Sequence, residues 1–100
     1  MDFLVRIDTT RVHELPADER DDLIRRERVR GNELMDQGVL RHFWRLPGAR
    51  SNIGIWSAPD ADALVEALDS LPVRPYAECD VTALATHPMV AEREAGAARA

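Results

Sequence analysis

Four segments of the chain alternate apolar and polar residues with a period of about two, which is typical of β-strands. In the first segment Phe3, Val5 and Ile7 would point to one face of a sheet. The other three segments are residues 39–46, 51–57 and 76–84. Pro47 and Gly48 lie between the second and third segments and predict a turn, so we expect these two strands to form a hairpin.

Two further segments have the features of amphipathic helices. The first follows Pro16 with an acidic run, which a helix N-terminus favours, and we expect it to end near Gly38, a suitable C-terminal cap. The second opens at Pro59 and Asp60, carries leucines at three- and four-residue intervals, and ends at Pro72.

The predicted order of elements, βαββαβ, is that of a ferredoxin-like α+β fold, in which one antiparallel sheet carries two helices on one face. We expect residues 1–90 to form this single domain, and residues 91–100, a low-complexity segment rich in alanine, to form a flexible C-terminal tail. The other face of the sheet needs a cover. A second copy of the chain would provide it, as in a dimeric α+β barrel, so we expect a homo-oligomer.

Composition argues against several classes of function. The net charge of -5 and the pI near 5.1 disfavour nucleic-acid or membrane-surface binding, because both require a positive surface. All 13 basic residues are arginines, so a Schiff-base lysine is excluded and the cations are suited to holding anions. Proton transfer must then fall to a carboxylate or a histidine.

The sequence predicts a reduced, cytoplasmic protein that uses no cofactor. The first residues contain no apolar segment of the length of a signal peptide or membrane span, and the single Cys79 cannot form an internal disulfide. The histidines at positions 13, 42 and 87 lack the spacing of metal ligands, and no glycine-rich phosphate loop is present. We therefore expect a reaction carried by side chains alone.

Glu27 is the most informative polar residue of the first predicted helix. At 100° per residue it falls inside the apolar arc of that helix, so its carboxylate should face the sheet. One interpretation is a buried ion pair with Arg30, Arg41 or Arg45. The other is a proton shuttle, because burial raises a carboxyl pKa while a nearby guanidinium lowers it. Gly31, one turn further on, would leave space for a small substrate or permit close packing.

The predicted hairpin concentrates polar chemistry in a chain with few aromatic residues. Strict alternation places two sets of side chains on opposite faces of its first strand: Leu40, His42, Trp44 and Leu46 on one, Val39, Arg41, Phe43 and Arg45 on the other. His42 is either a core histidine bonded to a carbonyl or a functional group, and Trp44 is more typical of packing than of recognition. Asn52 could serve the turn or donate to an oxyanion.

The hairpin also carries a family resemblance. The run from Arg41 to Leu46, followed by Gly48 and Asn52, resembles the signature of the muconolactone isomerases. The likeness covers roughly the first 90 residues and includes several further features: the strand of residues 3–5, Glu27 before Gly38, Leu71–Pro72, Pro75–Tyr76 and His87–Pro88. The chain differs from the family where Ala49 and Arg50 stand in place of the usual His and Tyr.

This resemblance implies a cofactor-independent intramolecular oxidoreductase of aromatic catabolism, cytoplasmic and built of dimers that assemble into decamers. Such an enzyme shifts the ring double bond of muconolactone, or of a related carboxylated butenolide, to give the enol-lactone of 3-oxoadipate. Glu27 would shuttle the proton, and His42 or Asn52 would stabilise the dienolate oxygen. The remaining candidates would bind substrate, the arginines through its carboxylate: Arg41, Arg45, Arg50 and Trp44.

Two alternatives are compatible with the same fold. A cofactorless monooxygenase or a lactone- or polyketide-processing enzyme would use Trp44 and His42 around an aromatic substrate. A non-catalytic module that binds a small ligand or serves assembly would contain Glu27 only as an ion-pair partner.

Overall fold

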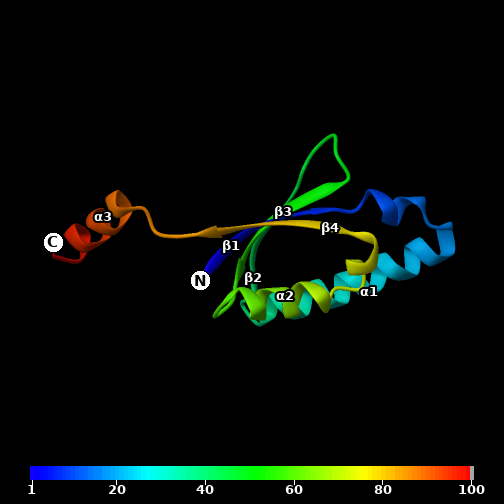
Figure 1. The fold of residues 1–100 in the computed structure, drawn as a ribbon, viewed down its shortest axis with the longest axis horizontal. Coiled ribbons are helices and arrows are strands. Elements are labelled where there is room, and N and C mark those ends of the chain that lie inside the picture. Colours follow the sequence, from blue (N-terminus) through cyan, green and yellow to red (C-terminus); the bar gives the residue numbers. More distant parts are fainter. Residues whose placement is uncertain (100) are drawn as a thin grey trace.

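The computed structural model describes residues 1–99 and contains one four-stranded antiparallel sheet (Figure 1). Its strands are β1 (Asp2–Asp8), β2 (Leu40–Arg45), β3 (Ser51–Ser57) and β4 (Glu78–Leu84). They lie in the order β2-β3-β1-β4, with β1 and β3 in the centre. This is the ferredoxin-like arrangement, so the predicted fold class is confirmed.

The two predicted helices lie on the same side of the sheet, as Figure 1 shows. They are α1 (Ala17–Asp36) and α2 (Ala61–Asp69). The side chain of Asp60 caps α2 by accepting a hydrogen bond of 2.8 Å from the N–H of Ala63. Gly38 follows α1 with a φ of +75°, the left-handed conformation expected of a glycine beyond a helix C-terminus. The start of α2 at Asp60 and the end of α1 before Gly38 therefore agree with the sequence prediction.

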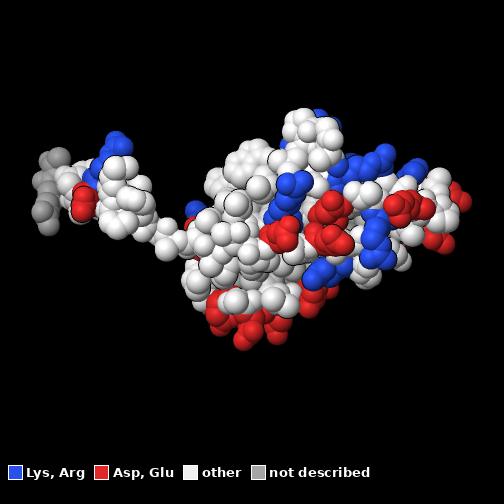
Figure 2. Space-filling model, turned by 45° about the horizontal axis from the view of Figure 1, so that its top comes forward, with Lys and Arg blue, Asp and Glu red and all other residues white. Residues whose placement is uncertain are grey.

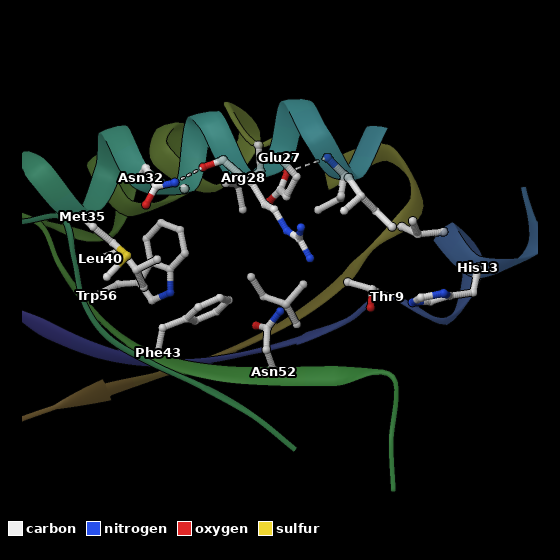
Figure 3. A pocket seen from close by; sticks show the side chains of 16 residues that line it. Thr9, His13, Glu27, Arg28, Asn32, Met35, Leu40, Phe43, Asn52 and Trp56 are labelled. Atoms are coloured by element: carbon white, nitrogen blue, oxygen red, sulfur yellow. Dashed lines mark hydrogen bonds between the residues drawn. The ribbon is translucent and has the colours of Figure 1, made fainter. Parts of the chain in front are cut away.

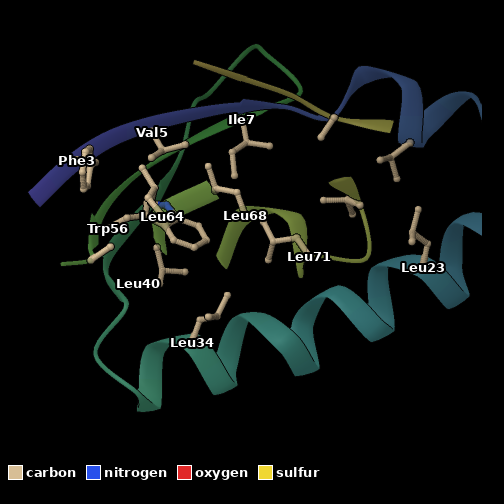
Figure 4. Close-up of a cluster of buried hydrophobic side chains, with 14 residues drawn as sticks. Phe3, Val5, Ile7, Leu23, Leu34, Leu40, Trp56, Leu64, Leu68 and Leu71 are labelled. Carbon is tan, nitrogen blue, oxygen red and sulfur yellow. The ribbon is translucent and has the colours of Figure 1, made fainter. Parts of the chain in front are cut away.

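The hydrophobic core fills the space between the helices and the sheet (Figure 4). Phe3, Val5 and Ile7 of β1 are each at most 2 % exposed and belong to one cluster with leucines of both helices. On β3, Trp56 pairs with Phe3 across the sheet and is also buried. Because a fully buried side chain of this size contributes roughly 1.5–3 kcal/mol, the alternation in β1 fixes which face of the sheet receives the helices.

A β-bulge in β2 changes the faces that strict alternation predicts for the hairpin. Leu40 pairs with Trp56 and His42 with Ile55, so Arg41 has no partner of its own and the register shifts by one residue. Leu40 therefore shares the helix-facing side of the sheet with Phe43, and not with His42 as the sequence predicts.

Two short 3-10 helices, which the sequence does not predict, complete the domain. One, η1 (Thr10–Glu14), follows β1, and the other, η2 (Arg74–Tyr76), precedes β4. The fourth strand consequently begins at Glu78, two residues later than expected. Within the described residues no helix is both long and apolar enough to cross a membrane.

The C-terminal segment forms a helix, α3 (Pro88–Arg99), that stands away from the rest of the domain in Figure 1. The sequence predicts a flexible tail over residues 91–100, of which residue 100 lies outside the described residues. The helix forms because alanine, glutamate and arginine are strong helix formers and Pro88 suits the first helical position. The mobility of this helix relative to the domain stays a prediction.

On the face drawn in Figure 2, arginines lie among acidic side chains.

Candidate functional site

A cavity of about 300 Å³ lies between α1 and the helix-facing side of the sheet (Figure 3). Its lining combines polar and apolar side chains. The polar ones that bear on the chemistry are Thr9, His13, Glu27, Arg28, Asn32 and Asn52. Met35, Leu40, Phe43 and Trp56 form an apolar end. A small, partly apolar molecule with a few polar groups fits such a site.

Glu27 lies on α1 and contributes its carboxylate to this cavity. It is partly buried, and its Oε2 accepts a hydrogen bond of 3.1 Å from the N–H of Val73. Burial raises the pKa of the Glu27 carboxyl above its usual value, and the Val73 hydrogen bond lowers it by a smaller amount. The carboxylate is therefore a stronger base than an exposed glutamate.

The ion pairs that a structural role for Glu27 would require are not formed. Arg30 pairs with Glu33 at 2.9 Å, and Arg41 pairs with Asp2 at 3.4 Å. Among the side chains that the structure describes, those of residues 1–97, none forms a salt bridge with Glu27. Gly31 lies one turn along α1 and also lines the cavity, and a Cβ at this glycine would meet no atom within 4 Å. The space beside the acid that the sequence suggests is therefore present.

Asn52 reaches the cavity from β3. It pairs with Ile7 of β1, whose side chain faces the helices, so the amide of Asn52 points to the same side. Its Oδ1 is buried without a hydrogen-bond donor in the described part of the chain. An amide can present either its oxygen or its NH₂ group to a ligand. Asn52 is thus free to bind a substrate, as the sequence predicts for one of its two roles.

Arg28 is a cavity residue that the sequence analysis does not select. Figure 3 shows its guanidinium directed from α1 into the cavity, toward the side that carries Asn52. The helical projection gives the direction of a Cβ but not the reach of a long side chain, which can bend toward an apolar surface while its charge stays solvated. In the sequence, the one feature that could have pointed to Arg28 is its position next to Glu27. Arg28 places a permanent cation in the same cavity as the candidate base.

A second, more open hollow of about 460 Å³ adjoins the first and shares Asn52 and Phe43 with it. It contains the predicted anion-binding residues Arg45 and Arg50. The N–H and Oγ1 of Thr9 both donate to the carbonyl oxygen of Arg50, at 2.8 Å and 3.0 Å. These bonds hold the hairpin end beside η1, so a cationic entrance borders the cavity.

His13, a further residue missed by sequence reasoning, lines both hollows. Burial lowers the pKa of its imidazole below the usual value, and the positive charges of Arg50 and Arg20 lower it further. His13 is therefore mostly neutral at pH 7, and it can donate or accept a hydrogen bond at the entrance.

Three of the predicted site residues line neither of the two hollows. His42 and Trp44 are on the opposite face of the sheet, where their rings stack at 5.7 Å between centroids with an interplanar angle of 8°. Arg41 sits at the bulge and pairs with Asp2 at the domain edge. Within one chain, the expected roles of His42 in holding an oxyanion and of Trp44 and Arg41 in binding substrate are therefore not supported. The bulge puts His42 and Trp44 on the face opposite to Leu40, and Arg41 is paired outside the cavity.

Comparison with known proteins places this architecture in a family. A model of the family described as muconolactone delta-isomerase matches residues 1–90. The chain belongs to the muconolactone delta-isomerase family. It is 35 % identical over 86 residues to the muconolactone delta-isomerase of Cupriavidus pinatubonensis, covering 86 % of this chain and 94 % of the relative. It is 36 % identical over 86 residues to that of Acinetobacter baylyi, covering 86 % and 90 %.

The fold of the muconolactone delta-isomerase family is also seen in a solved structure. The crystal structure of a muconolactone isomerase superposes with a TM-score of 0.76 at 30 % sequence identity, covering 88 % of this chain and 92 % of the other. The family resemblance and the enzyme class inferred from the hairpin are therefore confirmed. Among residues 1–99 no group of three or more His, Cys, Asp or Glu side chains is arranged to hold a metal ion.

Proposed function

We propose that this isomerase converts muconolactone, or a closely related butenolide with a carboxylate arm, into the corresponding enol-lactone by a 1,3-proton transfer. The observation that carries the proposal is the partly buried Glu27 carboxylate, which faces a cavity of about 300 Å³ without an ion-pair partner in the described residues. The names of the relatives supply the substrate class.

The geometry supports a mechanism with one acid–base group. Glu27 takes the proton from the ring carbon that bears the acetate arm, and the electron pair moves through the ring double bond to the lactone carbonyl oxygen. The resulting dienolate is reprotonated by Glu27 at the carbon next to that carbonyl, which moves the double bond. The proton returns to the substrate, so no net proton or electron is exchanged.

The polar groups around Glu27 have complementary roles. Arg28 attracts the substrate carboxylate through a charge-assisted hydrogen bond, and Arg50 and Arg45 favour its approach at the entrance. Asn52 hydrogen-bonds the substrate from the floor of the cavity. The apolar walls limit the access of water to the dienolate. The proposal includes no metal and no organic cofactor.

We also propose that the enzyme is cytoplasmic and that a second copy of the chain covers the open face of the sheet. Trp44 is 52 % exposed there and is stacked on His42, an arrangement that leaves a large aromatic surface in water in the single chain. Light scattering at micromolar concentration should give a multiple of the 11.2 kDa chain mass. A monomeric mass would contradict the oligomer and leave the enzymatic proposal intact.

The direct test of the enzymatic proposal is incubation of the purified protein with muconolactone. Formation of the enol-lactone is followed by ultraviolet absorbance and by ¹H NMR in deuterated buffer, where the carbon that receives the proton can become labelled. Catalysed loss of muconolactone with appearance of the isomer is expected. A rate equal to that of buffer, with folded protein, would reject muconolactone as substrate.

A further inference from the structure

Trp56 contributes a buried hydrogen-bond donor to the apolar end of the cavity. Its side chain is only 1 % exposed, yet its indole Nε1 has no acceptor among the described residues. In Figure 3 the indole lies near Phe43 and Leu40, at the end of the cavity away from His13. A buried N–H without an acceptor is rare in native proteins and destabilises the fold.

Packing alone does not account for an indole at this position. Trp56 pairs with Phe3 across the sheet and belongs to an otherwise apolar cluster. A phenylalanine would fill most of the same space without burying a polar atom. The N–H therefore reduces the stability of the free protein, and this loss is recovered where a ligand supplies an acceptor.

Trp56 and Asn52 lie on the same face of β3, separated by Gly54. Four residues of strand span about 13 Å, so the two side chains reach different parts of the cavity. In Figure 3 the guanidinium of Arg28 points toward the side of the cavity that carries Asn52. The cavity thus has a permanent cation near its centre, cations at its entrance, and a neutral donor at its apolar end.

We propose that the indole N–H of Trp56 is a catalytic hydrogen-bond donor to the lactone carbonyl oxygen of the substrate. This inference rests on the proposed function. The carbonyl oxygen and the acetate arm project from opposite sides of the lactone ring, so an arm held by Arg28 directs the carbonyl away from the cationic entrance. When Glu27 removes the ring proton, the electron pair moves to this oxygen and the hydrogen bond strengthens. It weakens again when Glu27 returns the proton.

The substrate reaches the donor by displacing side chains that cover the apolar end. Met35 is 48 % exposed and Phe43 is 47 % exposed, and both line the cavity beside Trp56. Since each is already half in solvent, a change of rotamer gives up little core packing. Methionine is the most adaptable of the apolar side chains.

The test replaces Trp56 by phenylalanine, with Trp44→Phe as the matched control on the opposite face of the sheet. With muconolactone, Trp56→Phe should lower kcat by about 10²-fold, the scale of a lost oxyanion donor, and change KM less. Its melting temperature should equal or exceed that of the wild type, since the unpaired donor is gone. Trp44→Phe should retain wild-type kcat.

A merely structural Trp56 predicts a different pattern. Trp56→Phe would then lower the melting temperature and leave the kcat of the folded fraction unchanged, and this result would overturn the proposal. If the wild-type enzyme turns over muconolactone and Trp56→Phe has full kcat, the donor role fails while the proposed function stands. If the folded wild type is inactive on muconolactone, both fail.

Binding can be observed directly at the indole nitrogen. The chain has two tryptophans, so a ¹⁵N-labelled sample gives two indole N–H signals, which Trp44→Phe assigns. The probe is the saturated lactone acetate, which lacks the ring double bond and cannot isomerise. On titration, the Trp56 signal should move downfield as a hydrogen bond forms, and the Trp44 signal should stay in place. Saturable binding without a downfield shift of the Trp56 signal would overturn the inference.

Discussion

The backbone N–H of Val73 donates to Oε2 of Glu27 at 3.1 Å, which joins α1 to the segment between α2 and η2. The two residues are 46 positions apart, so the bond forms only in the folded domain. Among the described side chains and backbone groups, the other carboxylate oxygen of Glu27 accepts no hydrogen bond. One oxygen is therefore fixed by the fold, and the other is left for the substrate.

Glu27→Gln should abolish most activity without weakening the fold. Glutamine keeps an oxygen for Val73 but cannot cycle a proton, so kcat should fall by about 10²-fold or more. The pKa of the Glu27 carboxyl is higher in the folded than in the unfolded protein. The protonated carboxyl therefore adds to the free energy of unfolding below the unfolded pKa, and this contribution is lost as pH rises through the folded pKa. At neutral pH the ionised carboxylate therefore costs stability.

The melting temperature of Glu27→Gln at pH 7 should consequently equal or exceed that of the wild type, and the oligomer should be retained. Thermal unfolding and steady-state kinetics on the same preparation check both parts. Wild-type turnover in the folded variant would remove Glu27 from the mechanism. A large fall in melting temperature would instead favour a structural role.

The pH dependence of kcat/KM should report the raised pKa of Glu27. Below this pKa the carboxyl is protonated and cannot accept the ring proton, so activity should fall on the acid side with a midpoint above the ordinary glutamate value of about 4.5. Circular dichroism should show a folded protein through this range. The residual rate of Glu27→Gln should lack this limb, and its persistence there would assign the titration to another group.

The fold was predictable from the sequence because its signals are local. The alternation of β1, the Asp60 cap and the glycine after α1 each specify an element within a few residues. The bulge at Arg41 is different, since no glycine marks it and it depends on how Leu40 and Trp56 meet across the sheet. One extra residue reverses the faces of all that follow relative to Leu40, so the predicted grouping of Leu40 with His42 and Trp44 is wrong.

The candidate site was predictable only in part, for the same reason. Glu27 could be placed on the sheet-facing side of its helix from helical periodicity, and Asn52 became a candidate through its amide and the family resemblance. Arg28 depends on the bend of a long side chain, and His13 on an unpredicted 3-10 helix. The unpaired nitrogen of Trp56 is visible only once its neighbours are placed in space.

Arg28→Met should weaken substrate binding because it removes the cation inside the cavity. We expect KM to rise by 10-fold or more, since a charged hydrogen bond contributes about 1.5–3 kcal/mol. The matched control is Arg26→Met on the same helix, where Arg26 pairs with Asp22 at 3.0 Å and does not line the cavity. Equal effects of the two substitutions on KM would show that only the overall charge matters.

Arg50→Met and Arg41→Met should separate the entrance of the cavity from the domain edge. Arg50 lines the outer hollow and its charge acts on His13, so its loss should raise KM, and the effect should shrink in high salt because the entrance is exposed. Arg41 pairs with Asp2 outside the cavity, and Arg41→Met should leave KM near the wild-type value. A larger effect at Arg41 would indicate that this residue reaches a site in a neighbouring copy.

Gly31→Ala and Gly54→Ala should have opposite effects on stability. A Cβ at Gly31 meets nothing within 4 Å, so alanine should stabilise α1 by up to about 1 kcal/mol. The alanine methyl group also enters the space beside Glu27 and should raise KM.

A Cβ at Gly54 would lie 2.9 Å from the carbonyl oxygen of His42, and the backbone of β2 would have to move. This variant should lose about 1–3 kcal/mol of stability, the usual cost of overpacking. Denaturant unfolding and kinetics on both proteins check the contrast. Unchanged KM in a stabilised Gly31→Ala enzyme would show that substrate does not use the space at this turn of α1.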